Sequence, residues 1–110
     1  MLQRTIILAL LLFSSLILSC ATIEELAPLV DEAAVNLAIS SGVDPSMAAR
    51  GRTIYITSCV RCHSPEPVAG YNLVYWQTYI LPKMAKRSKL SETDTQALEA
   101  YIKLTLQAVK

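Results

Sequence analysis

One short motif in this sequence has the residue types and the spacing for covalent chemistry. Cys59 and Cys62 are separated by two residues, and His63, the single histidine of the chain, follows at once. Two thiols at this spacing can add across the two vinyl groups of a porphyrin, and the next imidazole then lies beneath the iron as a ligand. The motif therefore predicts one covalently attached haem c, with Cys59 and Cys62 binding the porphyrin and His63 binding the metal.

A zinc site and a redox dithiol are the two other uses of such a motif. A structural zinc ion normally has four ligands, whereas the sequence has no second cysteine pair at this spacing and no second histidine. A thioredoxin-like dithiol belongs beside a βαβ pattern, and strand signals are weak throughout the chain. A disulfide between the two cysteines would leave His63 unexplained. Haem attachment accounts for all three residues.

The second iron ligand opposite His63 is predicted to be the thioether of Met84. Met1 leaves with an export signal, and lysine side chains bind metal only after losing a proton, which is costly at neutral pH. Met47 is an alternative, but it lies with Gly51, Tyr55 and Cys59 on one expected helix stripe of four-residue spacing, which favours core packing. Met84 follows Pro82, a helix breaker that could direct the thioether toward the iron. Without Met84 as a ligand, the haem would be five-coordinate.

The first nineteen residues have the pattern of a bacterial export signal. One positive charge, Arg4, precedes an apolar run over residues 6–18, which is shorter than the roughly 20 residues that span a bilayer but typical of a signal peptide. The run ends in Ile17-Leu18-Ser19-Cys20, which resembles a lipoprotein signal in which Cys20 is lipidated and becomes the first mature residue. An ordinary secretory signal is the alternative. Thr22 in place of aspartate favours the outer membrane, facing the periplasm.

The elements that must position the motif are all predicted to be helices. After a tether over residues 21–27, apolar residues recur at helical spacing from about Pro28 to Ser40. Asp44 and Pro45 have the types of an N-cap and first helical residue, and that helix runs toward Cys59. The fold class is therefore all-α, with a signal at 1–19, a tether and extra N-terminal helix at 20–43, and the haem domain at 44–110.

The second half of the chain supplies a loop and two more helices. Prolines and a glycine mark residues 64–71 as a loop, and Pro82 should kink or end a helix that starts near Leu73. Ser91 and Asp94 have the spacing of a capping box that opens the last helix. Its inward stripe is predicted to consist of Ala97, Leu98, Tyr101, Ile102 and Thr105.

The region from about Pro45 to Ala108 resembles small single-haem class I cytochromes c. Gly51-Arg52-Thr53-Ile54-Tyr55 followed by Cys59 is similar to the N-terminal helix of that family, and Leu98-Glu99-Ala100-Tyr101-Ile102 is similar to its C-terminal helix. Trp76 followed at eight residues by Met84 is similar to a subset of short bacterial members. The usual Met-Pro element of the family is absent, and Met84 lies only 21 residues after His63.

The resemblance implies a cytochrome c-like domain wrapped around one haem, with Gly51 allowing two helices to touch and Tyr101 packed over it. It implies that Trp76 either donates its indole N–H to a haem propionate or packs against the ring, and it makes Tyr71 a weaker propionate candidate. It also implies that Pro65 or Pro67 offers a carbonyl to the His63 imidazole, a bond that would fix the orientation of the ring.

These residues together predict an electron carrier without enzymatic activity or a small-molecule substrate. The formal net charge of +1 gives no reason to expect nucleic acid. Redox proteins are the expected partners. If the basic side chains around the haem edge form a docking surface, these partners should be acidic; the cluster consists of Lys83, Lys86, Arg87 and Lys89. The alternative is that these side chains form a solvated helix face. The alternatives are a five-coordinate haem protein that binds a gas or acts as a weak peroxidase, and a haem subunit of a membrane complex that docks through the helix at residues 28–40.

Overall fold

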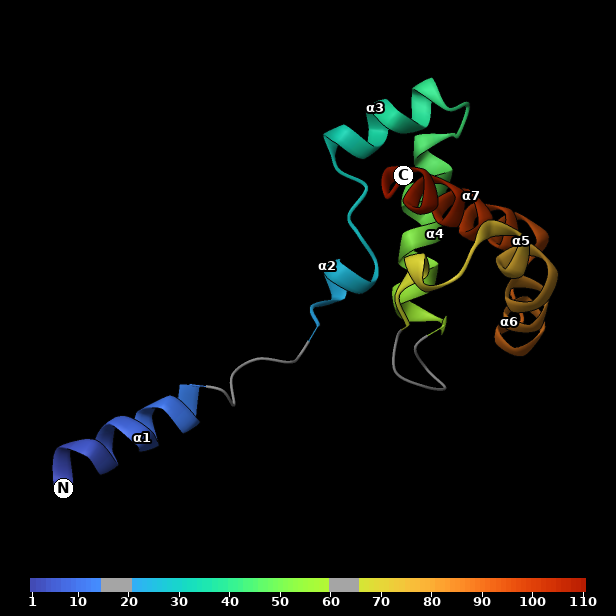
Figure 1. The fold of residues 1–110 in the computed structure, drawn as a ribbon. Helices are drawn as coiled ribbons and strands as arrows, with labels where there is room; N and C mark the ends of the chain where they lie inside the picture. Colours follow the sequence, from blue (N-terminus) through green and yellow to red (C-terminus); the bar gives the residue numbers. More distant parts are fainter. Residues whose placement is uncertain (15–20, 60–65) are drawn as a thin grey trace.

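A computed structural model gives the chain an all-helical architecture (Figure 1). It describes residues 1–14, 21–59 and 66–110, with no side-chain description for residues 10–14, and within these ranges it contains no strand. The predicted all-α class is thereby confirmed. The elements are α1 (Leu2–Ser14), α2 (Ile23–Leu26), α3 (Glu32–Ser40), α4 (Pro45–Thr57), η3 (Val68–Gly70), α5 (Leu73–Tyr75), η4 (Trp76–Ile80), α6 (Leu81–Ser88) and α7 (Glu92–Ala108).

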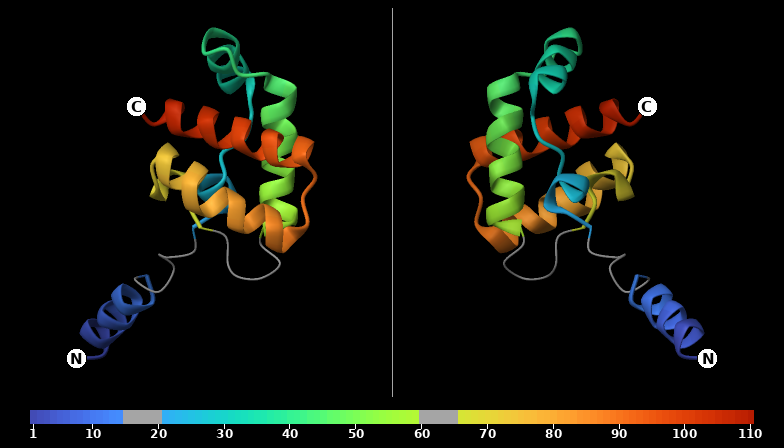
Figure 2. Two further views of the ribbon diagram at one scale, coloured as in Figure 1. Left: turned by 90° about the vertical axis from the view of Figure 1, so that its right-hand side faces the viewer. Right: turned by 90° about the vertical axis from the view of Figure 1, so that its left-hand side faces the viewer.

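The crossing of α4 and α7 is the centre of the fold (Figures 1 and 2). A Cβ atom added to Gly51 would lie 2.0 Å from the backbone oxygen of Ala97 and 2.7 Å from the Cβ of Tyr101. The two backbones can approach this closely only because residue 51 has no side chain. The close crossing at Gly51, with Tyr101 packed beside it, is therefore confirmed.

Caps at the starts of α4 and α7 fix where the crossing helices begin. The carboxylate of Asp44 accepts the backbone N–H of Ser46 at 2.8 Å, and Pro45 follows as the first helical residue. The hydroxyl of Ser91 accepts the backbone N–H of Asp94 at 3.0 Å, which confirms the predicted cap. These bonds satisfy amide donors that have no partner inside the helix.

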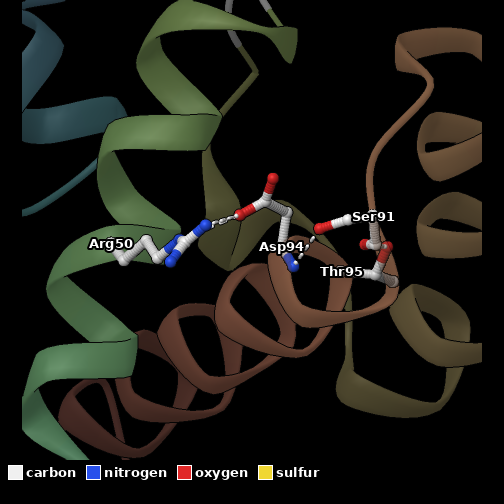
Figure 3. Close-up of polar contacts among 4 residues, drawn as sticks. All are labelled: Arg50, Ser91, Asp94 and Thr95. Carbon is white, nitrogen blue, oxygen red and sulfur yellow. Dashed lines mark hydrogen bonds and ion pairs between the residues drawn. The ribbon is translucent and has the colours of Figure 1, made fainter.

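The structure shows the Ser91 half of the predicted capping box, whereas the side chain of Asp94 pairs with Arg50. The Asp94 carboxylate accepts from Nε of Arg50 at 2.8 Å and lies 2.6 Å from Nη2 of the same guanidinium (Figure 3). The side chain thus ties the first turn of α7 to the middle of α4. The buried face of α7 comprises Ala97, Leu98, Tyr101, Ile102, Leu104 and Thr105, so the predicted inward stripe is confirmed and Leu104 is added to it.

The N-terminal helix begins later than the sequence predicts. Asp31 is the N-cap of α3 and accepts the N–H of Ala34 at 2.9 Å, so the expected start near Pro28 is wrong. The carbonyl of Pro28 instead accepts hydrogen bonds from Nε of Arg52 at 3.1 Å and from the hydroxyl of Tyr101 at 2.9 Å. These long-range bonds hold Pro28 in an extended connection against α4 and α7.

The predicted tether over residues 21–27 also contains regular structure. Thr22 and Glu25 form a capping box that opens the single turn of α2, and Ala27 is fully buried in the core. The segment therefore meets the helical body at Ala27, whereas α2 itself has no buried residue. In the parts of the chain that the structure describes, no helix is both long and apolar enough to cross a membrane.

The segment from α5 to α6 is one continuous helical run with a π-helical turn, η4, in its middle. The N–H of Leu81 bonds to the carbonyl of Trp76, five residues earlier. Pro82 comes next and has no N–H to donate, and its ring would clash with a carbonyl of the preceding turn in a regular α-helix. The wider π turn accommodates the proline. Pro82 thus changes the helix geometry without ending the helix.

Candidate functional site

A cavity of about 330 Å³ lies between the C-terminal end of α4 and the run from α5 to α6. Four residues predicted from the sequence to serve the cofactor line it together: Cys59, Tyr71, Trp76 and Met84. They come from two stretches of the chain, the end of α4 and the run from Tyr71 through α6, and the fold brings these together. The remaining lining residues are Tyr55, Glu66, Tyr75, Ile80, Lys83 and Arg87.

Cys59 follows the last turn of α4 and is only 5% exposed. Burial raises the pKa of its thiol to about 11, because a thiolate is poorly solvated in an apolar environment. The thiol is therefore protonated at neutral pH. It lies on the same α4 face as Gly51 and Tyr55, both of which are buried, as the four-residue spacing predicts.

Aromatic rings form the inner wall of the cavity. Trp76 is 3% exposed and meets Tyr55 edge-to-face, with ring centroids 6.3 Å apart. The indole N–H of Trp76 donates to the backbone carbonyl of Val68 at 2.9 Å. Because that donor already has a buried partner, the geometry favours the packing role for Trp76 over a hydrogen bond to a propionate.

The thioether of Met84 reaches the cavity from α6. The extra residue in a π turn changes the direction, about the helix axis, in which all later side chains of the helix point. In a regular α-helix, Trp76 and Met84 would point about 80° apart, but across η4 both line the same cavity, together with Ile80. Met84 is partly buried against the main core cluster. The π turn is thus the feature that places a thioether opposite the end of α4.

Met47, the alternative thioether, lies elsewhere. It contributes to a separate hollow beside Gly42, Val43 and Asp44, at the N-terminal end of α4. Twelve residues of helix, about 18 Å, separate this end from Cys59. Met47 is partly buried and belongs to neither core cluster of the described residues, so its core-packing role stays a prediction, but it lines a hollow other than the cavity at Cys59.

The rim of the cavity is polar and carries both signs of charge. The hydroxyl of Tyr71 donates to Oε2 of Glu66 at 3.0 Å, and this bond raises the pKa of Tyr71. The hydroxyl of Tyr55 donates to the backbone carbonyl of Glu66. Lys83 and Arg87 line the cavity from α6. The sequence reasoning missed Tyr55 and Glu66 as site residues, although Tyr55 lies on the predicted α4 stripe.

Several predicted site residues lie outside the described part of the chain. These are Cys62, His63 and Pro65 of the motif region, and Cys20 of the proposed lipid site. Pro67, the other candidate partner of the imidazole, is the residue before η3. Among the residues that the structure does describe, there is no group of three or more His, Cys, Asp or Glu side chains that could hold a metal ion.

No protein-family model, curated protein or solved structure matches this chain. The motif and the cavity are therefore the features that point to a function. A thiol, a thioether and aromatic faces around one cavity are compatible with a flat apolar group bonded to sulfur at Cys59. A haem fits this donor set, because the thioether of Met84 can bind iron without losing a proton.

Proposed function

We propose that this protein is an electron carrier with one haem c bonded to Cys59 and Cys62 and ligated by His63 and Met84. The observation that carries the proposal is the position of Met84, which lines the same cavity as the first cysteine of the attachment motif. The crossing of α4 and α7 at Gly51 adds support, since the resemblance to class I cytochromes c implies that contact.

In this proposal the residues of the motif and of the cavity have distinct tasks. The two cysteines would hold the porphyrin covalently, and Tyr55 and Trp76 would cover it and exclude water. A haem would supply a one-electron iron couple. His63 and Met84 would both bind the iron, which would leave no place for a substrate, and a Met/His pair raises the reduction potential. A lipid on Cys20 would hold the carrier at the periplasmic face of the outer membrane, close to its redox partners.

Retention of haem on the denatured polypeptide tests the proposal. Acidic acetone should remove no haem from the purified protein, whereas a Cys59→Ser/Cys62→Ser variant should lose all of it. Cys20→Ala is the matched control, since it removes a cysteine but leaves the motif intact and should retain haem. Complete extraction of haem from the unmodified protein would contradict the proposal.

Carbon monoxide separates the electron carrier from a five-coordinate haem protein. With both axial positions filled, the reduced protein should bind carbon monoxide slowly and weakly. Rapid binding at micromolar concentration would favour the gas-binding or peroxidase alternative. Extraction in mild detergent tests the remaining alternative, because a subunit of a membrane complex should co-purify with its partners.

A further inference from the structure

A row of side chains at every fourth position runs along the exposed side of the α5–α6 segment. It consists of Tyr71, Tyr75, Tyr79, Lys83 and Arg87. The rings of Tyr71 and Tyr75 stack with centroids 5.2 Å apart, and those of Tyr75 and Tyr79 lie 5.1 Å apart. Figure 2 shows this segment on the outside of the helical body, with one side free of other helices.

The aromatic half of the row is exposed to solvent. Tyr75 is 44% exposed and Tyr79 is 62% exposed, and the neighbouring Val74 is 70% exposed. Exposed apolar side chains that gather on one face are typical of contact surfaces. Tyrosine in particular favours the boundary between water and lipid, because its ring is apolar and its hydroxyl is polar.

The other half of the row is strongly basic. Lys86 and Lys89 lie close to Lys83 and Arg87 in the sequence, and all four side chains are exposed. Residues 67–91 contain no Asp or Glu. Glu99 touches the segment through the side-chain amide of Gln77, but its carboxylate also pairs with Lys103 at 3.1 Å. Glu66 also contacts the segment, by accepting from the hydroxyl of Tyr71 at 3.0 Å. The four basic side chains outnumber these two acids, so the segment presents net positive charge beside its tyrosines.

We propose that this face, which we call the tyrosine–lysine face (Tyr71, Tyr75, Tyr79, Lys83 and Arg87 with the neighbouring Lys86 and Lys89), lies on the anionic surface of a membrane. Exposed tyrosines suit the boundary between water and lipid, and the positive charges are attracted to anionic lipids. An acidic protein is the other candidate, since tyrosine is also common at protein interfaces; the membrane is favoured because the lipid proposed at Cys20 would already hold this body beside a bilayer. This face would be a second membrane signal beside the lipid proposed at Cys20.

The proposed contact also sets an orientation. Tyr71, Tyr75, Lys83 and Arg87 line the cavity at Cys59 as well as belonging to the tyrosine–lysine face. One rim of the cavity would therefore rest against the lipid surface. Electrons entering or leaving by that rim would pass to a partner embedded in, or lying on, the membrane.

Vesicle binding by the mature chain without its lipid, Cys20→Ala, tests this inference. The protein should sediment with vesicles of phosphatidylethanolamine and phosphatidylglycerol but not with phosphatidylcholine alone, and less so as salt is added. Replacing Lys83, Lys86, Arg87 and Lys89 by Gln should weaken binding by about a hundredfold or more. Lys103→Gln/Lys110→Gln removes two charges from α7 and the C-terminus and should change binding little.

A Tyr75→Ser/Tyr79→Ser variant separates the membrane from an acidic protein as the partner. On a membrane it should bind anionic vesicles several-fold more weakly while keeping its circular dichroism spectrum. Unchanged vesicle binding by this variant would overturn the proposal, and so would absence of binding by the parent chain. The haem-free Cys59→Ser/Cys62→Ser variant should bind vesicles as well as the parent, so that failure of the haem proposal and failure of this contact give different results.

Discussion

In the proposed electron carrier, Met84 is the side chain on which the redox properties would depend most. Replacing Met84 by Ala should remove the weak near-infrared charge-transfer band that a methionine–iron bond gives to the oxidised protein. It should also lower the reduction potential and allow rapid carbon monoxide binding. Met47→Ala is the control and should leave all three properties unchanged, because Met47 lines a different hollow. A band that survives Met84→Ala but disappears in Met47→Ala would show that the ligand is misassigned.

Cys59 gives a pH prediction for the haem-free chain. Burial raises the pKa of the folded thiol to about 11, whereas an unfolded thiol has a pKa of about 8.5. Between these values the unfolded chain loses its proton first, so the free energy of unfolding should fall as the pH rises through this window. Urea denaturation of a Cys20→Ser/Cys62→Ser chain at pH 8 and pH 10 measures the effect. The decrease should be smaller when Cys59 is also replaced by Ala, and an equal decrease would contradict the assignment.

At the scale of single residues, the sequence predicted which side chains gather but not how they are paired. Cys59, Trp76 and Met84 could be selected because their types and intervals match a known chemistry. The bond from the Trp76 indole to the carbonyl of Val68 could not be foreseen, because it depends on the path of the chain through η3. Glu66 was missed for the same reason, since its contacts with Tyr55 and Tyr71 are tertiary.

Among the helices, the contact between α4 and α7 should tolerate an added side-chain atom least. Gly51→Ala would place a Cβ atom 2.0 Å from a backbone oxygen of α7, and a backbone atom can move only if the helices separate. We expect a loss of about 3 kcal/mol or more in the free energy of unfolding, at or above the usual range for overpacking. Thermal or urea unfolding measures this loss. Ala49→Gly, at an exposed position of the same helix, is a matched control and should cost about 1 kcal/mol.

Helix positions followed from the sequence where the signals were local. The caps at Asp44 and Ser91 each need only a few neighbouring residues, and both were predicted correctly. The start near Pro28 was wrong because distant partners, Arg52 and Tyr101, bond its carbonyl. The π turn before Pro82 was not predicted either, since a proline signals only that the regular hydrogen-bond pattern must change.

In the whole molecule, the described residues 21–43 contribute to the packed helical body. Ala27 is buried in the main core cluster, and α3 packs with α4 and α7. The boundary predicted at residues 43 and 44 is therefore not a boundary between separately packed parts. A lipid on Cys20 would hold this body close to the membrane, because only a few residues separate Cys20 from the buried Ala27.

The attachment of the whole molecule to the membrane should involve two forces that salt distinguishes. A lipid on Cys20 inserts into the bilayer by the hydrophobic effect, which salt does not weaken. The basic side chains of the tyrosine–lysine face act through charge, which salt screens over a distance of about 3 Å at 1 M. The unmodified protein should therefore stay with the membrane fraction after a wash in 1 M salt. Cys20→Ala should leave the membrane in the same wash, because one of its two attachments is lost and the other is screened. Because Cys20 is part of the predicted lipoprotein signal, this variant should be exported with a signal peptide for soluble proteins, so that both proteins reach the same compartment. If Cys20→Ala resists the salt wash as firmly as the unmodified protein, the anchor lies elsewhere in the chain.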